Sequence, residues 1–149
     1  MLEFEIAAIY YFIASVIKAK PYFDEVPRNM LTPCVFYPTP NADGDGFSLS
    51  SYSTDFVIYL KFIDATTRGA CIMANDVLQA VMKNRRKIPL VDENGKYTGK
   101  NFTIKNAIVK KIDNGVYQME ISWTRYARYN AEAITLAKEF FFNGNPVAE

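Results

Sequence analysis

The chain contains no histidine among its 149 residues. Histidine is the commonest general base near neutral pH and the commonest metal ligand, so the usual Ser-His and Cys-His catalytic pairs are excluded. Cysteine is scarce as well, and Cys34 and Cys71 are too few for a four-ligand zinc site or a disulfide framework. We interpret both as buried free thiols in a reducing compartment, with a disulfide between them as the alternative.

An excess of charge of either sign is also missing, because 17 basic and 16 acidic residues leave a formal net charge of +1. No long-range field therefore favours nucleic acid or an acidic membrane. The most apolar stretch, residues 2–17, contains Glu3 and Glu5, has no basic residues before it and is too short to cross a bilayer. We expect neither a signal peptide nor a membrane partner.

The acidic residues form no complete metal-binding motif. Asp43-Gly44-Asp45-Gly46 resembles part of a calcium loop, but the glutamate that ends such a loop is missing at the required distance. The adjacent pairs Asp24-Glu25 and Asp92-Glu93 stand among turn residues and are interpreted as solvated charges. The sequence also lacks a glycine-rich phosphate loop. We therefore predict no catalytic residue, no metal ligand and no cofactor.

Apolar and aromatic residues, by contrast, are abundant. Half of the chain is hydrophobic and 15% is aromatic, with ten tyrosines and eleven phenylalanines. This length and composition suit a single domain over residues 1–149 with a substantial core. The aromatic residues fit either a large core or contact surfaces, and the composition weighs the two interpretations equally.

Apolar spacings of three and four residues predict a helix over residues 2–17 and another over 66–87. The first helix carries more apolar surface than one side of a small sheet would cover. Thr66 or Thr67 is the expected cap of the second. A last helix is predicted over residues 130–143, with a strand as the alternative, and the role of the C-terminal segment 130–149 stays open.

Alternating apolar residues predict about four strands. A short strand over residues 34–37, bounded by prolines, is expected near a sheet edge after an irregular connection over 21–33. A mobile loop over 39–51 leads to a strand over 55–63, on which Phe56, Ile58, Leu60 and Phe62 form the apolar face. The last two strands form a long hairpin, and the residues expected on their apolar faces are Phe102, Ile104, Asn106, Ile108, Lys110 and Ile112, then Tyr117, Met119, Ile121 and Trp123.

These elements predict an α+β fold in the order α-β-β-α-β-β, followed by the C-terminal helix. The hairpin turns at Asn114-Gly115, a favoured hairpin dipeptide. The strand–helix–strand passage around residues 67–87 requires a crossover onto one face of a mixed or antiparallel sheet. We therefore expect a single domain with helices packed on a sheet of about four strands.

A basic cluster at the end of the second helix is the best candidate for phosphate contact: Lys83, Arg85, Arg86 and Lys87. The alternative, which we favour, is that these cations complement the negative end of the helix dipole. Tyr126 and Tyr129 stand among Arg125 and Arg128 and fit base stacking or a subunit contact. Near-neutral net charge favours the subunit contact.

The order of elements resembles the tail terminator proteins of tailed bacteriophages and related contractile particles. The resemblance covers residues 2–129: the first helix, the strand Thr32-Pro33-Cys34-Val35-Phe36-Tyr37, the strand over 55–63, the helix over 70–87 and the hairpin over 102–129. It implies a small protein that forms a ring, typically hexameric, on the last tier of the tail tube. It carries no catalytic residues.

The resemblance further implies a tail-tube protein and a neck or connector protein as partners, with DNA only as passing cargo. The protein would belong to the virion tail or neck and be made in the host cytoplasm. A ring subunit needs two different contact surfaces, and the exposed segments over 41–47 and 91–100, the first helix and the hairpin could supply them. The candidate subunit contacts are Asp43, Asp45, Phe47, Lys96, Tyr97, Tyr126 and Tyr129.

Three other functions remain as alternatives. A head-completion or connector protein of the phage neck shares the same sequence features. A nucleic-acid-binding accessory protein would use the basic cluster at residues 83–87. A histidine-free enzyme would have to be built on aspartate and glutamate alone.

Overall fold

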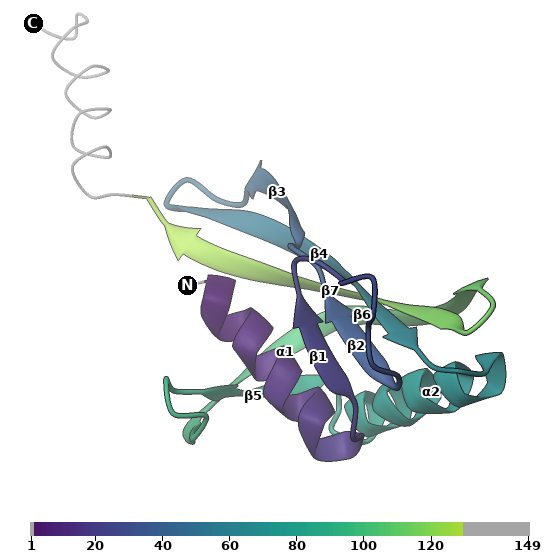
Figure 1. Cartoon of the computed structure of the whole chain (residues 1–149). Coiled ribbons are helices and arrows are strands. Elements are labelled where there is room, and N and C mark those ends of the chain that lie inside the picture. The colour runs from purple at the N-terminus through teal and green to yellow at the C-terminus, as the bar shows by residue number, and fades with distance from the viewer. Residues whose placement is uncertain (1, 130–149) are drawn as a thin grey trace, which may run out of the picture. The chain divides into compact units, whose positions relative to one another are not determined.

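The computed structural model describes residues 2–129 (Figure 1). The predicted C-terminal helix over 130–143, and the segment 130–149 as a whole, lie outside the described residues. The elements in chain order are α1 (Leu2–Val16), β1 (Lys20–Phe23), β2 (Cys34–Tyr37), β3 (Asn41–Gly46), β4 (Ser51–Ile63), α2 (Thr67–Lys83), β5 (Lys87–Val91), β6 (Tyr97–Asp113) and β7 (Val116–Arg128).

The described chain consists mostly of β-strands, so the predicted α+β fold with helices on a sheet of about four strands was wrong. Seven strands form a mixed sheet in the order β1-β2-β4-β7-β6-β5, and β3 pairs with β4. β1 runs parallel to β2, whereas the pairs β2–β4, β5–β6 and β6–β7 are antiparallel. The predicted order of elements omitted β1, β3 and β5.

Two of the missed strands contain a proline, Pro21 in β1 and Pro89 in β5. Both strands lie at the ends of the strand order. Proline lacks an N–H group, which a strand needs only on the side that faces a neighbour, so edge strands tolerate it. Because β2 lies next to the edge strand β1, the prediction that residues 34–37 lie near a sheet edge is confirmed. The prediction of an irregular connection from residue 21 was wrong, since β1 spans Lys20–Phe23.

β3 replaces part of the predicted mobile loop over 39–51. Its sequence, NADGDG, has no apolar alternation, and all its residues are exposed. Pairing with β4 makes this segment a strand, since ladder hydrogen bonds can hold a sequence of low strand propensity. Local sequence alone therefore favoured the wrong structure here.

The hairpin of β6 and β7 confirms the predicted turn at Asn114-Gly115. Its apolar faces follow the prediction only in part, because the pairing register shifts between Ile104 and Asn106. An extra residue in one strand reverses which side chains face the core. Ile104 is buried, but Ile108 and Ile112 are 44% and 46% exposed, and Ala107 and Val109 pack against the core instead.

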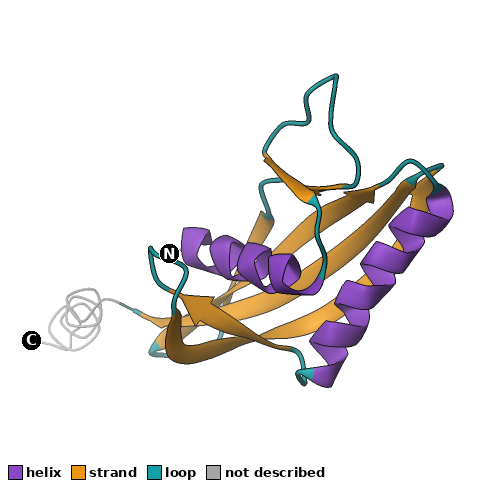
Figure 2. Cartoon of the chain, turned by 60° about the horizontal axis from the view of Figure 1, so that its bottom comes forward, coloured by secondary structure: helices purple, strands orange, loops and turns teal. Residues whose placement is uncertain are grey.

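The two predicted helices are confirmed, although both end earlier than expected. α2 starts after Thr66, whose side-chain oxygen accepts a hydrogen bond of 3.0 Å from the amide of Gly69. It ends at Lys83 instead of residue 87. Figure 2 shows both helices on the same side of the sheet. No helix in the described residues is long and apolar enough to span a membrane.

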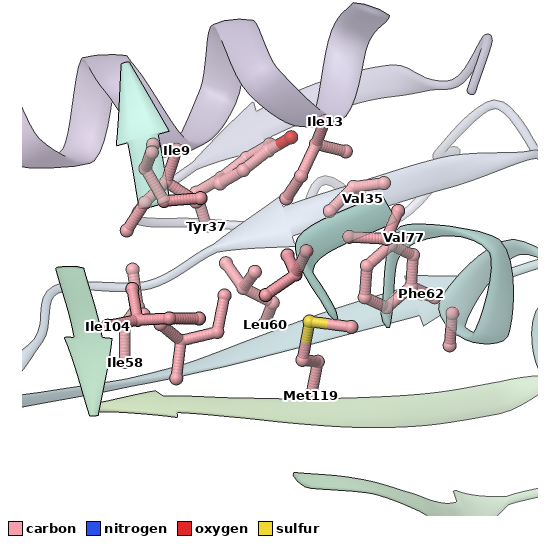
Figure 3. Packing of buried hydrophobic residues seen from close by; sticks show 14 of the residues in the cluster. Ile9, Ile13, Val35, Tyr37, Ile58, Leu60, Phe62, Val77, Ile104 and Met119 are labelled. Atoms are coloured by element: carbon pink, nitrogen blue, oxygen red, sulfur yellow. The ribbon is translucent and has the colours of Figure 1, made fainter. Parts of the chain in front are cut away.

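The hydrophobic core lies between this face of the sheet and the two helices (Figure 3). The predicted inner face of β4 is confirmed, because Ile58, Leu60 and Phe62 are fully buried. Ile9 and Ile13 of α1 close the core from the other side. Large buried side chains from the sheet and from both helices therefore hold the helices on this face. Neither helix covers the opposite face of the sheet.

The chain divides into two compact units. The first comprises Met1–Asn41 and Phe56–Trp123, and the second comprises Ala42–Asp55 with the residues from Thr124 onward. All buried residues of the core cluster belong to the first unit. The interpretation of residues 1–149 as one domain stays a prediction.

Candidate interaction surfaces

Within residues 2–129, no group of His, Cys, Asp or Glu side chains is arranged to hold a metal ion. Both cysteines are free thiols. Cys34 is fully buried, and burial raises the pKa of its thiol. Cys71 is partly exposed and hydrogen-bonds with Tyr117, a contact that raises the pKa of the tyrosine. A raised thiol pKa lowers the fraction of reactive thiolate, so Cys34 is suited to packing.

The predicted basic cluster is a turn between α2 and β5 and not the last turn of a long helix. Arg85 and Arg86 adopt left-handed backbone conformations, with φ of 56° and 61°. The carbonyl of Arg86 accepts a hydrogen bond of 2.8 Å from Ile104, and its guanidinium donates one of 2.9 Å to the carbonyl of Lys105. Lys83 ends α2 and Lys87 begins β5. Arg86 therefore fastens β6 to the turn.

Tyr97 begins β6 and Lys96 lies in the turn before it, apart from the other predicted contact residues in sequence. The Asp92 carboxylate accepts hydrogen bonds of 2.8 and 2.9 Å from the amides of Asn94 and Lys96 and so closes the turn. Tyr97 is exposed, and its hydroxyl accepts a hydrogen bond of 3.2 Å from Asn101. The predicted exposed segment over 91–100 is thus the ordered end of the β5–β6 hairpin.

The structure does bring Phe47, Tyr126 and Tyr129 into one small unit, here called the aromatic arm (residues 42–55 and 124–129). The rings of Phe47 and Tyr126 lie 4.7 Å apart, and those of Tyr52 and Tyr129 lie 5.5 Å apart. The Tyr129 amide donates a hydrogen bond of 2.9 Å to the carbonyl of Ser50. Sequence reasoning missed Tyr52, whose pairing with Tyr129 depends on the strand register.

The aromatic arm has apolar residues on its surface but no buried core among its described residues. Phe47 is 64% exposed, Tyr126 is 59% exposed and the Leu49 side chain is fully exposed. Small β-structures that bury no apolar face are marginally stable alone. Exposed aromatic side chains that gather in such a unit are typical of a surface that is buried against a partner.

The arm is also acidic along its first segment. Asp43 and Asp45 lie in the exposed strand β3, Asp55 follows in β4, and no basic residue occurs between 42 and 55. Asp55 accepts a hydrogen bond of 2.5 Å from the hydroxyl of Thr124. Asp45 bonds only the amide of Gly46 among the described residues. The two β3 carboxylates are therefore open to an outside partner.

An aromatic groove of about 570 Å³ lies in the first unit beside α1. Tyr10 of α1 packs edge-on against Phe23 and Tyr37, at ring distances of 5.5 and 5.8 Å. Phe23 stacks on Tyr37 at 5.1 Å. Burial, with Tyr10 as a second cause, raises the pKa of Tyr37 above its ordinary value. This groove accounts for part of the surplus apolar surface that the sequence showed on the first helix.

The side of the sheet that faces away from the helices, here called the outer face, carries Tyr59 and Lys61 of β4, Gln118 and Glu120 of β7, and Ile108, Lys110 and Ile112 of β6. Along β4 and β7 these side chains alternate with those that face the core, but Gln118 is itself buried, at 7% exposure. Lys61 donates a hydrogen bond to Gln118, and Gln118 lies opposite Lys110 in the β6–β7 pairing. Burial and the nearby charge of Lys110 lower the pKa of Lys61.

Comparison with known proteins finds a distant sequence similarity to a protein of a phage-like element. No family model matches the chain. The chain is 25% identical to the phage-like element PBSX protein XkdJ of Bacillus subtilis (strain 168) over 129 residues. The matched region covers 86% of this chain and 88% of that protein. The chain is 22% identical, with the same coverage, to the uncharacterized protein YqbJ of the same organism. The chain is thus similar to a protein of a phage-like element, which agrees with the broader part of the predicted relationship.

Among solved structures, the chain matches one from a virion of a native gene transfer agent particle. The TM-score is 0.45 and the sequences are 15% identical, over 83% of this chain and 94% of that chain.

Proposed function

We propose that this chain is a structural protein of a phage-type virion, and that it forms the ring that ends a tail tube, as tail terminators do. The observation that carries the proposal is the similarity to the phage-like element PBSX protein XkdJ over 129 residues. The resemblance of the element order to tail terminators supplies the finer role. In this role the chain acts through contacts with its own copies, the tube protein and the neck protein, without catalysis.

The surfaces of the two units support a role in assembly. The aromatic arm exposes Phe47 and Leu49 and buries no core of its own. The outer face exposes Ile108 and Ile112 between charged residues. A closed ring needs two different surfaces on each subunit, so that each copy contacts two neighbours by a rotation. The arm and the outer face differ in chemistry, as the two surfaces of such a pair must.

The basic turn gives less support to the nucleic-acid alternative. The Arg86 guanidinium is engaged with the Lys105 carbonyl, and the backbone of Arg86 is bonded to Ile104. A cation that holds two strands together is less available for phosphate. We therefore prefer assembly to nucleic-acid binding for this chain.

Electron microscopy of the purified chain with tail tubes of its own particle tests the proposal. We expect rings at one end of each tube, and tubes of uniform length when the chain is present during assembly. Tubes of unregulated length, with the chain found in the head or absent from particles, would contradict the tail-terminator role. A binding curve for duplex DNA that weakens steeply with salt, and is abolished by Lys83→Gln with Lys87→Gln, would favour the alternative.

A further inference from the structure

We propose that the outer face of the sheet is the docking site for the aromatic arm of a second copy of this chain. The inference rests on the proposed ring function, for which it names the contact surfaces. It uses one surface from each unit, and each is described by its own residues. The contact is heterologous, because an arm on one copy meets a face on the next.

Within residues 2–129, neither helix covers the outer face, although Gln118 within it is only 7% exposed. Both helices pack on the opposite side, against the core residues that alternate with Tyr59 and Lys61 along β4. The register shift between Ile104 and Asn106 turns Ile108 toward the outer face, and a second shift between Lys111 and Asp113 lies at Ile112. The two side chains are 44% and 46% exposed. A β-bulge commonly re-aims side chains in this way. The result is an aliphatic patch on the surface that the sequence pattern had assigned to the core.

The charges of this face indicate an acidic partner. Lys110 pairs with Gln118 in the strand register, and the Gln118 side chain accepts a hydrogen bond from Lys61. Lys110 forms no ion pair within the described residues, and its charge disfavours a second charge on Lys61. Glu120 is the acidic residue of the outer face and lies opposite Ile108. A carboxylate placed near Lys61 and Lys110 would relieve this repulsion.

The first segment of the aromatic arm has the complementary chemistry, whereas its second segment carries Arg125 and Arg128. Asp43 and Asp45 supply carboxylates that form no ion pair within residues 2–129, and Phe47 and Leu49 follow them with exposed apolar side chains. Acidic and apolar groups thus occur in close succession on the arm, as basic and aliphatic groups do on the outer face. Opposite charges orient the encounter, while burial of apolar side chains supplies affinity. This match is the reason to choose a second copy as the occupant.

A charge-exchange experiment tests the inference with the full chain. Self-association is measured by sedimentation and light scattering for the unmodified chain, for Asp43→Lys with Asp45→Lys, for Lys110→Glu, and for all three changes together. Each partial set should weaken association by about tenfold or more, and the combination should recover much of the loss, because charges of opposite sign face each other again. Far-UV circular dichroism and urea unfolding verify that the variants are folded.

Matched controls carry the same charge changes elsewhere. Asp76→Lys lies on the exposed side of α2, and Lys100→Glu lies in β6 outside the outer-face patch. Both should leave association within about twofold of the unmodified chain, as expected for rim or distant charges. Equal losses in the controls, or no recovery in the combined variant, would overturn the inference.

The outcomes separate this inference from the proposed function. If rings form and persist in all charge variants, the ring function stands and the arm–face contact is wrong. If the unmodified chain stays monomeric at every concentration, the contact between copies is overturned, and the tail-tube experiment then decides the function on its own. If Asp43→Lys with Asp45→Lys weakens only the binding of a tube or neck protein, the arm binds that partner. The proposal that the arm docks on a second copy is then overturned.

Discussion

The ring of Tyr11 in α1 lies directly against Gly95 in the turn between β5 and β6. A methyl group added to Gly95 would stand 2.9 Å from the Tyr11 Cζ atom, closer than side chains approach one another. Gly95 also has a φ of +80°, a conformation that other residues adopt only at a cost. This contact joins the first helix to the edge of the sheet that lies farthest from β1 in the strand order.

Gly95→Ala should therefore destabilise the fold by about 2–4 kcal/mol, the sum of a strained backbone and a displaced ring. Urea unfolding measures the loss. Gly99→Ala is the matched control, because Gly99 has a φ of +86° but no atom within 4 Å of an added methyl group. The control should cost about 1–2 kcal/mol for the backbone alone. Equal losses in the two variants would show that the Tyr11 contact contributes nothing.

Trp123 is expected to contribute by packing and not by a hydrogen bond. It is 1% exposed, its ring stacks on Phe56 at 5.5 Å, and its indole Nε1 has no hydrogen-bond partner within the described residues. Trp123→Ala should cost about 3–5 kcal/mol of unfolding free energy. Trp123→Phe should cost clearly less, because it keeps an aromatic ring beside Phe56 and loses no bonded N–H. Thermal unfolding of both variants checks this, and similar losses would contradict it.

Alkaline pH should destabilise the chain through Tyr37. Burial raises the pKa of Tyr37 above its ordinary value of 10.0, so the folded state keeps the hydroxyl proton while the unfolded state loses it. The unfolded state then binds fewer protons, and the free energy of unfolding falls as pH rises above 10.0.

Tyr37→Phe should therefore flatten the decrease in the free energy of unfolding above this pH, although the substitution changes packing at every pH. Urea unfolding at a series of pH values measures the slope. The exposed Tyr126→Phe is the control for removal of a tyrosine hydroxyl at the surface. An unchanged slope in Tyr37→Phe would contradict the prediction.

The aromatic arm should matter more for association than for folding. Phe47→Ser with Tyr126→Ser removes two exposed rings from a unit without a buried core. Exposed substitutions of this kind usually change stability by less than about 0.5 kcal/mol. We expect nearly unchanged thermal unfolding together with at least about tenfold weaker self-association, since aromatic residues dominate contact energies. Loss of folding in this variant would instead assign the rings a structural role.

Local sequence signals determined the parts of the fold that depend on near neighbours. The two helices, the strand over 55–63 and the turn at Asn114-Gly115 follow from spacing and turn preference, and the structure contains each of them. The same signals correctly placed Ile58, Leu60 and Phe62 in the core. These features rest on interactions within a few residues along the chain, so a pattern of residue types can specify them.

Candidate contact residues could be predicted only as exposed or aromatic positions. Phe47 and Tyr126 are 79 positions apart in the sequence, and only the pairing of the arm strands brings their rings to 4.7 Å. Lys96 and Tyr97 were grouped with them but lie in the β5–β6 hairpin of the other unit. A list of exposed residues contains no information about which of them become neighbours.

The sequence by itself therefore determined that the chain lacks the usual histidine-based catalytic groups and that its two helices would have an apolar side to bury. Only the tertiary structure decided that β1, β3 and β5 join the sheet, because backbone hydrogen bonds to a neighbouring strand can recruit segments with proline, glycine or aspartate. It also decided which face Ile108 occupies, because the register shift between Ile104 and Asn106 reverses the alternation that the sequence displays.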